Sequence, residues 1–348
     1  MIIKRLSLGI ILILLASAIL LISDWKRRKG TSNSAHTNPR ISTAAAQPAP
    51  KKWNIHLIEY TNVLDVEESE HGIRDGLREA GLIEGKDYIW KVRNAQGDIA
   101  VLSSLIDAAV TDGADLLMTM STPTLQIAIK RGGGKPVVFT LVASAVAAGA
   151  GRTNEDHLPG VTGVVTTSAY EELISVLRET MPAARRLGTL FVPAETNSVY
   201  NMERISEAAR KAGLEIISVP ANTSGEVPDA ALALMSRHPD AICQIAGNLT
   251  ASAFPSIVQA ARKAKLPIFG FQSSQAHGGA CVVVARDYYD GGREAAHMAA
   301  RVIRGENPGT MPFTPLKTTR LLVNMKAAAS CGLIIPASIL QKASQVIR

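Results

Sequence analysis

Polar side chains with little formal charge follow most of the apolar segments that this sequence predicts to be strands. In the first half of the chain they include Tyr60, Asn62, Ser121, Thr122, Thr124 and Thr140. In the second half they include Glu195, Asn197, Ser198, Asn248, Gln272 and Ser273. Hydroxyl and amide groups of this kind suit the reversible capture of a small polar molecule through hydrogen bonds. The pattern therefore predicts a binding site at the strand ends.

The segment Ser121–Thr124 (STPT) has the composition of a helix start. A hydroxyl can cap the first turn of a helix. Pro123 is suited to that first turn, because a backbone N–H there would have no partner within the helix. The other N–H groups of such an end point outward and favour a carboxylate or another anion. The alternative is that Ser121 or Thr122 only caps its own helix.

Asp287 follows a predicted strand and precedes a predicted helix, together with two tyrosines and Asp290. One interpretation is that Asp287 lies at the cleft or hinge and balances the ammonium group of a ligand. The other is that Asp290 caps the helix and that the tyrosines cover a joint between lobes. The sequence leaves both open for Asp287.

Motifs typical of enzymes do not occur in the sequence. It contains no GxSxG, HExxH, GxxxxGK[ST] or strand-linked GxGxxG pattern, and its histidines are scattered without ligand spacing. The three cysteines, Cys243, Cys281 and Cys331, fit neither a metal site nor a disulfide framework, although one disulfide is compatible with an oxidising compartment. We expect a non-enzymatic protein with no catalytic residues, no cofactor and no metal.

The net charge of +7 arises largely near the N-terminus. Lys4 and Arg5 precede an apolar run from Leu6 to Ile22, and four further basic residues lie at 26–29. No basic stripe interleaved with aromatic residues follows, so we expect no nucleic-acid partner.

The apolar run Leu6–Ile22 is near the short end of the length range for a membrane-spanning helix, and it continues past its only candidate cleavage site, Ala16–Ala18. We expect an uncleaved signal anchor over residues 1–29 and a flexible linker over 30–51. Cleavage and membrane orientation stay open.

From Trp53 onward, apolar strands and amphipathic helices alternate in the rhythm of βαβ units. The expected strands of the first half are Ile55–Tyr60, Tyr88–Val92, Leu116–Met120, Val137–Val142 and Val161–Val165. Those of the second half are Leu187–Val192, Glu215–Val219, Ala241–Ile245 and Ile268–Phe271. Two successive α/β halves predict two similar lobes with a cleft at the carboxyl ends of their strands. We expect Cys281–Ala285 and the helix Gly291–Arg304 to return to the first lobe, and the final segments to cross back. The predicted lobes are thus residues 52–164 plus about 284–312, and 165–283 plus about 313–348.

Several stretches resemble the ABC transporter substrate-binding protein family, in particular its tryptophan- and tyrosine-type importer receptors. They are GIRDGLREAGLIEG (72–85), RNAQGD (93–98), STPT (121–124), PVVF (136–139), VTG (161–163), PAETNS (193–198) and DYY (287–289). Gly305–Pro308 and the tail 324–347 also resemble this family, so the resemblance runs from about residue 53 to the C-terminus.

The resemblance implies a type I periplasmic-binding-protein fold, in which two Rossmann-like lobes joined by hinge crossovers close on a small ligand. It carries ligand-facing roles onto Ser121–Thr124, Glu195, Asn197, Ser198, Asn248 and the Gln272–Ser273 pair. Where the family has an Asp-Pro pair after the PVVF strand, this chain has Ser144–Ala145, which removes a carboxylate for a ligand amine. The implied function is the extracytoplasmic receptor of an ABC-type importer, located in the periplasm or on the outer face of the cytoplasmic membrane. Its permease and ATPase subunits would be separately encoded. The alternative is a membrane-tethered sensor that uses the same fold.

Overall fold

Two mainly parallel sheets, each with helices on both faces, make up the part of the chain that the structure describes. The structure is a computed structural model, and it describes residues 51–348. The expected signal anchor at 1–29, and the expected linker up to residue 50, lie outside the described residues. None of the helices within residues 51–348 combines the length and the apolar character that a membrane span requires.

The first sheet has six parallel strands within the described range, in the order β11-β5-β4-β3-β1-β2. The strands are β1 (Trp53–Glu59), β2 (Tyr88–Asn94), β3 (Leu116–Met120), β4 (Val137–Val142), β5 (Val161–Val165) and β11 (Thr314–Pro315). Every residue of β3 is buried, as expected for a central strand with helices on both faces. This sheet and its helices form the first lobe.

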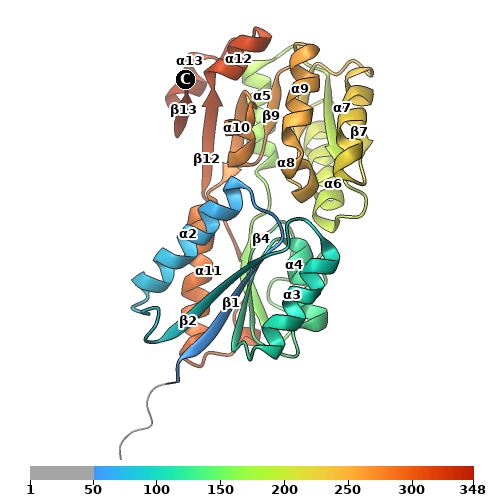
Figure 1. The fold of residues 1–348 in the computed structure, drawn as a ribbon. Coiled ribbons are helices and arrows are strands. Elements are labelled where there is room, and N and C mark those ends of the chain that lie inside the picture. Colours follow the sequence, from blue (N-terminus) through green and yellow to red (C-terminus); the bar gives the residue numbers. More distant parts are fainter. Residues whose placement is uncertain (1–50) are drawn as a thin grey trace, which may run out of the picture. The chain divides into compact units, whose positions relative to one another are not determined.

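Four helices cover the two faces of the first sheet (Figure 1). They are α2 (Leu64–Glu79) and α11 (Tyr288–Ile303) on one face, and α3 (Ile99–Thr111) and α4 (Thr122–Arg131) on the other. Helices α2 and α11 lie side by side although more than two hundred residues separate them in the chain. Glycine permits this approach, because a Cβ on Gly292 would lie 2.1 Å from the carbonyl oxygen of Ser69.

The second sheet has seven strands within the described range, in the order β13-β12-β10-β9-β8-β6-β7. The strands are β6 (Arg186–Phe191), β7 (Glu215–Pro220), β8 (Ala241–Gln244), β9 (Ile268–Gly270), β10 (Val282–Arg286), β12 (Thr319–Asn324) and β13 (Gln345–Ile347). All neighbours are parallel except β10 and β12. The helices are α5 (Tyr170–Thr180), α6 (Thr196–Lys211), α7 (Val227–Met235), α8 (Asn248–Ser252), α9 (Phe254–Lys263), α10 (Ser273–Gly278), α12 (Met325–Cys331) and α13 (Ala337–Lys342). Together they form the second lobe, so the expected two-lobe α/β architecture is confirmed.

The described chain passes between the lobes three times, from β5 to α5, from β10 to α11 and from β11 to β12. The second passage differs from the expectation that the strand around 281–285 returns to the first lobe. Strand β10 stays in the second sheet because it pairs with β9 and β12, and the return begins with α11. Likewise β11 pairs with β5 in the first sheet, although residues from 313 onward were expected in the second lobe.

Arg286 connects the three passages through its guanidinium group. Its Nε donates to the carbonyl oxygen of Thr167 at 2.6 Å, in the first passage. Its Nη1 donates to the carbonyl oxygen of Lys317 at 2.8 Å, in the third passage. Arg286 is the last residue of β10, where the second passage begins. Its side chain therefore holds the three passages between the lobes next to one another.

Candidate functional site

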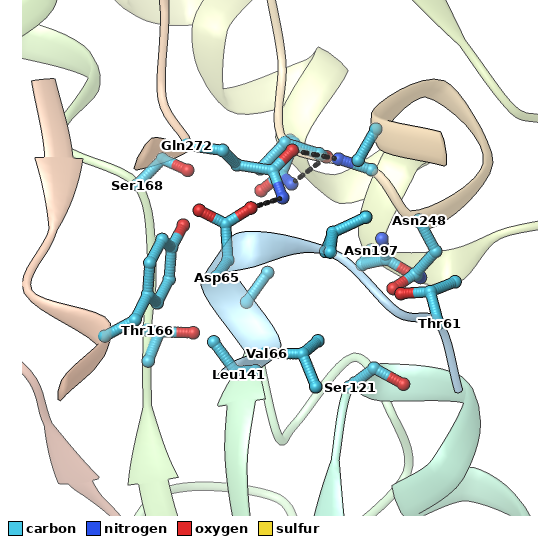
Figure 2. A pocket seen from close by; sticks show the side chains of 17 residues that line it. Thr61, Asp65, Val66, Ser121, Leu141, Thr166, Ser168, Asn197, Asn248 and Gln272 are labelled. Carbon is cyan, nitrogen blue, oxygen red and sulfur yellow. Dashed lines mark hydrogen bonds between the residues drawn. The ribbon is translucent and has the colours of Figure 1, made fainter. Parts of the chain in front are cut away.

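A small cavity of about 60 Å³ lies between the lobes, at the carboxyl ends of their strands (Figure 2). It is lined from the first lobe by Thr61, Val63, Asp65, Val66, Ser121, Leu141, Ala143 and Thr166, and at the second passage by Tyr288. From the second lobe and the first passage it is lined by Ser168, Asn197, Asn201, Ala246, Gly247, Asn248, Ala251 and Gln272. None of these described lining residues is Lys or Arg, so the polar contacts it offers are mainly hydroxyls and amides.

Four of the sequence-predicted residues lie together in this lining: Ser121, Asn197, Asn248 and Gln272. Ser121 occupies the N-cap position of α4, but its hydroxyl lies 3.0 Å from the Thr124 hydroxyl and accepts no backbone N–H. Its backbone has a φ of 91°, a conformation that favours glycine and is strained for other residues. Such strain is concentrated at functional sites, and here it lies at the cavity wall.

Glu195 joins the starts of two helices in the second lobe. Its carboxylate accepts hydrogen bonds from the backbone N–H of Asn248 at 3.1 Å and of Leu249 at 3.0 Å, at the N-terminus of α8. It also accepts from the side-chain amides of Asn248 and Asn197, at 3.1 and 3.3 Å. The carboxylate therefore orients the two asparagines that face the central cavity, while Asn197 Oδ1 has no hydrogen-bond partner in the described structure.

A larger cavity of about 610 Å³ adjoins the central one, since Thr61 lines both. Of the predicted residues, Tyr60 and Glu195 lie there, along with Lys130 of α4. The Tyr60 hydroxyl donates to the carbonyl oxygen of Gly97 at 2.8 Å. Burial, together with the negative charge of Glu195, raises the pKa of Tyr60 to about 12. The phenol therefore stays neutral and serves as a hydrogen-bonding group.

The remaining predicted residues lie outside these two linings. Thr122, Thr124, Thr140, Ser198 and Ser273 are buried within their lobes, and Asn62 is exposed beside a third cavity. Two of these hydroxyls are bonded inside the lobe, since Thr124 contacts Ser121 and the Ser198 Oγ accepts from Val192 N at 2.8 Å. Strand-end position alone therefore does not bring a side chain to the cavity.

Asp287 lies outside the central lining and caps α11. Its carboxylate accepts from the backbone N–H of Asp290 at 3.2 Å. The expectation that Asp290 is the cap is therefore wrong. Asp290 instead accepts from Arg293 Nη1 at 3.1 Å and from the Thr318 hydroxyl at 3.0 Å. Both aspartates are thus engaged at the second and third passages between the lobes.

Asp65, which was not predicted from the sequence, joins the two lobes at the cavity. Its carboxylate, in the first turn of α2, accepts from the Gln272 amide at 3.1 Å, as Figure 2 shows. It also accepts from Ser274 of α10, from the backbone N–H at 3.1 Å and the hydroxyl at 2.5 Å. Burial raises the pKa of Asp65 to about 6, although these hydrogen bonds oppose the shift. A second contact between the lobes pairs Glu68 with Arg320 at 3.3 Å.

Other lining residues were also missed, namely Thr61, Thr166, Ser168, Asn201 and Tyr288. Thr61 followed the first predicted strand and could have been included on that ground. Asn201 lies inside α6, where its amide donates to the carbonyl oxygen of Ala246 at 2.8 Å and its oxygen accepts from Tyr170. A residue within a helix gives no strand-end signal. Among residues 51–348, no group of three or more His, Cys, Asp or Glu side chains could hold a metal ion.

Comparison with known proteins gives matches over nearly the whole described part of the chain. A family model described as ABC transporter substrate binding protein matches residues 60–347. A tyrosine-binding protein of Clostridioides difficile is 25% identical over 84% of this chain and 83% of its own length. A crystal structure of a conserved domain protein from Vibrio cholerae is 28% identical with a TM-score of 0.81, covering 85% of this chain and 100% of that one. An ABC domain in complex with L-Trp from Streptococcus pneumoniae is 25% identical with a TM-score of 0.82, at the same coverage.

Proposed function

Since the chain belongs to the ABC transporter substrate-binding protein family, and is therefore a non-enzymatic receptor of ABC-type transport, we propose that it serves an importer. In this role it captures a small polar molecule outside the cytoplasm and delivers it to a separately encoded permease and ATPase. The observation that carries the proposal is the cavity at the strand ends of both lobes, whose polar lining consists mainly of hydroxyl and amide groups together with the Asp65 carboxylate. A site shared by two lobes couples ligand binding to their closure, because the ligand contacts both.

We propose an amino acid or a related molecule as the ligand. The names of the two relatives above, one tyrosine-binding and one solved with L-Trp, support this class. The central cavity, at about 60 Å³, is far smaller than the roughly 300 Å³ at the lower end of ligand pockets. A ligand of that class therefore requires the lobes to move apart and then to close around it.

Ser121, Asn197, Asn248 and Gln272 are the proposed direct ligand contacts. Three of them lie at helix starts in the second lobe, Asn197 in α6, Asn248 in α8 and Gln272 at the N-cap of α10, and Ser121 lies in the lining from the first lobe. Tyr60 and Glu195 act from the adjoining cavity, Glu195 by holding both asparagines in place. Asn62, Thr122, Thr124, Thr140, Ser198, Ser273 and Asp287 stay predictions without a place in the central lining.

The apolar segment Leu6–Ile22 supports a further proposal, that residues 1–29 tether the protein at the outer face of the cytoplasmic membrane. The linker proposed after it would let the two lobes reach a permease. Separation of cell membranes from soluble fractions tests the tether. Recovery of the chain only in a soluble, shortened form would show cleavage instead.

A thermal-shift screen with purified full-length protein tests the ligand class. L-Trp, L-Tyr, other amino acids, nucleosides and small organic acids should be compared, and the proposed class should give the largest rise in melting temperature. If no amino acid or amino-acid-like compound stabilises the protein while another class does, the proposed ligand class is wrong.

Titration calorimetry with the best compound then tests the site. The changes Asn197→Ala and Asn248→Ala should each weaken binding by about tenfold or more, since a lost hydrogen bond to a buried ligand costs about 1–3 kcal/mol. Ser236→Ala, at an exposed position of the second lobe, is the control and should bind like the parent. Unchanged affinity in both asparagine variants would place the site elsewhere.

A further inference from the structure

Two of the three cysteines meet inside the second lobe. Cys281, buried just before β10, has its Sγ 3.7 Å from the Sγ of Cys331, the last residue of α12. Cys331 is half-buried, and the two sulfurs line a small cavity of about 10 Å³ at the surface. The third cysteine, Cys243 of β8, is fully buried and lies in neither that cavity nor that contact. The pairing is therefore unambiguous.

We propose that Cys281 and Cys331 form a disulfide that cross-links the C-terminal part of the chain to the core of the second lobe. The bond length of a disulfide is about 2.05 Å, so the sulfurs need to approach by about 1.7 Å. That movement falls on Cys331, which ends its helix and precedes Gly332 in the left-handed conformation. Cys281 is held on both sides, since its N–H donates to Ile268 and its carbonyl oxygen accepts from Asn324.

The oxidation needs an external disulfide as the electron acceptor. The more exposed thiol, Cys331, attacks one sulfur of that disulfide as the thiolate and releases the first small thiol. Cys281 then attacks the Sγ of Cys331 in the mixed disulfide and releases the second thiol. Two protein thiols and one external disulfide thus become one protein disulfide and two small thiols, with both electrons on the latter.

The cross-link would close a loop whose ends are 50 residues apart and which contains α11, β11 and β12. Two of the three passages between the lobes, β10 to α11 and β11 to β12, lie inside this loop. Closing such a loop restricts the unfolded chain and stabilises the folded one. The bond lies away from the lining of the central cavity, so ligand binding should persist with the thiols reduced.

The compartment that the proposed function assigns favours oxidation, but the test of the pair does not depend on that function. Full-length protein, kept in mild detergent, is incubated in reduced or oxidised glutathione, unfolded and alkylated with N-ethylmaleimide, and weighed by mass spectrometry. The reduced sample should carry three labels and the oxidised sample one, on Cys243. Oxidation should raise the melting temperature by about 4–8 °C.

Matched variants distinguish the pair from other thiol chemistry. Cys243→Ser should retain both the loss of two labels and the thermal shift, whereas Cys281→Ala and Cys331→Ala should abolish both. Three labels after oxidation of the folded parent protein, a stable glutathione adduct on Cys331, or a dimer linked through it would each overturn the proposal. Protein can also be isolated from the cell envelope in acid, which stops thiol exchange, and then alkylated in the same way. It should again carry one N-ethylmaleimide label, and three labels would refute the disulfide in cells.

Discussion

The buried Asp65 carboxylate should make the folded chain less stable as the pH rises from about 4 to about 7. The ionised form is disfavoured in the folded state because burial removes water, and this raises the pKa from 3.8 to about 6. The unfolded chain releases this proton near pH 4, whereas the folded chain holds it until about pH 6. Stability present below the unfolded pKa is therefore lost as the pH passes through the folded pKa.

The shift corresponds to roughly 3 kcal/mol in total, at about 1.4 kcal/mol per pKa unit. About 1 kcal/mol of this is already lost at pH 4.5, which leaves about 2 kcal/mol between pH 4.5 and 7.5. The groups that face Asp65 are Gln272 and Ser274 of the second lobe, Glu68 of the same helix, and the buried phenol of Tyr288. Burial also raises the pKa of Tyr288, and Arg320 pairs with Glu68.

The change Asp65→Asn removes the titration but keeps the shape of the side chain. The variant should be destabilised at every pH, because an amide presents N–H groups where three donors now point at a carboxylate. Its deficit relative to the parent should shrink by about 2 kcal/mol from pH 4.5 to 7.5, or about 4 °C in melting temperature. Calorimetric melts of both proteins across this range measure it.

The same change at the exposed aspartate of α7, Asp229→Asn, provides the control for replacing a carboxylate with an amide. A deficit of Asp65→Asn that stays constant with pH, or that grows toward pH 7.5, would refute the reasoning. Growth would mean that the three donors outweigh burial and hold the pKa of Asp65 below its ordinary value. X-ray scattering at both pH values then reports whether the contact also governs separation of the lobes.

Two further predictions concern the packing of the first lobe and the passages between lobes. Gly292→Ala should lower the free energy of unfolding by about 1–3 kcal/mol in urea titrations, since its Cβ would meet the backbone of α2 at 2.1 Å. Gly225→Ala, whose Cβ would have its closest neighbour at 3.9 Å, is the control, and equal effects would contradict close helix packing. Arg286→Met should cost about 2–4 kcal/mol by the same measurement, because two carbonyl groups lose a charged donor. The control Arg237→Met, at an exposed position, should change the free energy of unfolding little. If the Arg286 variant is as stable as this control, the guanidinium group is not needed to hold the passages together.

Much of the fold was predictable because local patterns agree with the tertiary arrangement. The strand Leu116–Met120 is apolar throughout and is buried on both faces, and its bounds match the prediction. The helix after it begins at Thr122, where hydroxyls and Pro123 indicated a start. Helix α6 begins at Thr196, within the PAETNS segment, and its N-cap residue Glu195 makes no side-chain cap hydrogen bond. Helix α8 was missed because it has only five residues and Ala253 leads directly into α9.

The candidate site was predictable only in part. Strand-end polarity located Ser121, Asn197, Asn248 and Gln272, since the carboxyl ends of parallel strands meet at one edge of a sheet. It also selected hydroxyls such as Ser198 that turn back into their own lobe. The direction in which a strand-end side chain points depends on the packing around it. This direction cannot be inferred from the local order of residue types.

The order of residues was enough to predict the alternation of strands and helices, the polar character of the strand ends and the family resemblance. Hydrophobic period and capping chemistry act over a few residues and are therefore visible in the chain. The folded chain was needed to show that Asp65 contacts Gln272, that Cys281 contacts Cys331, and that β10 remains in the second sheet. The partners of Asp65 lie more than two hundred residues away, Cys331 lies 50 residues from Cys281, and β10 pairs with β12 from beyond the second and third passages. Such contacts arise from the three passages between the lobes and from strand pairing, which depend on the whole chain.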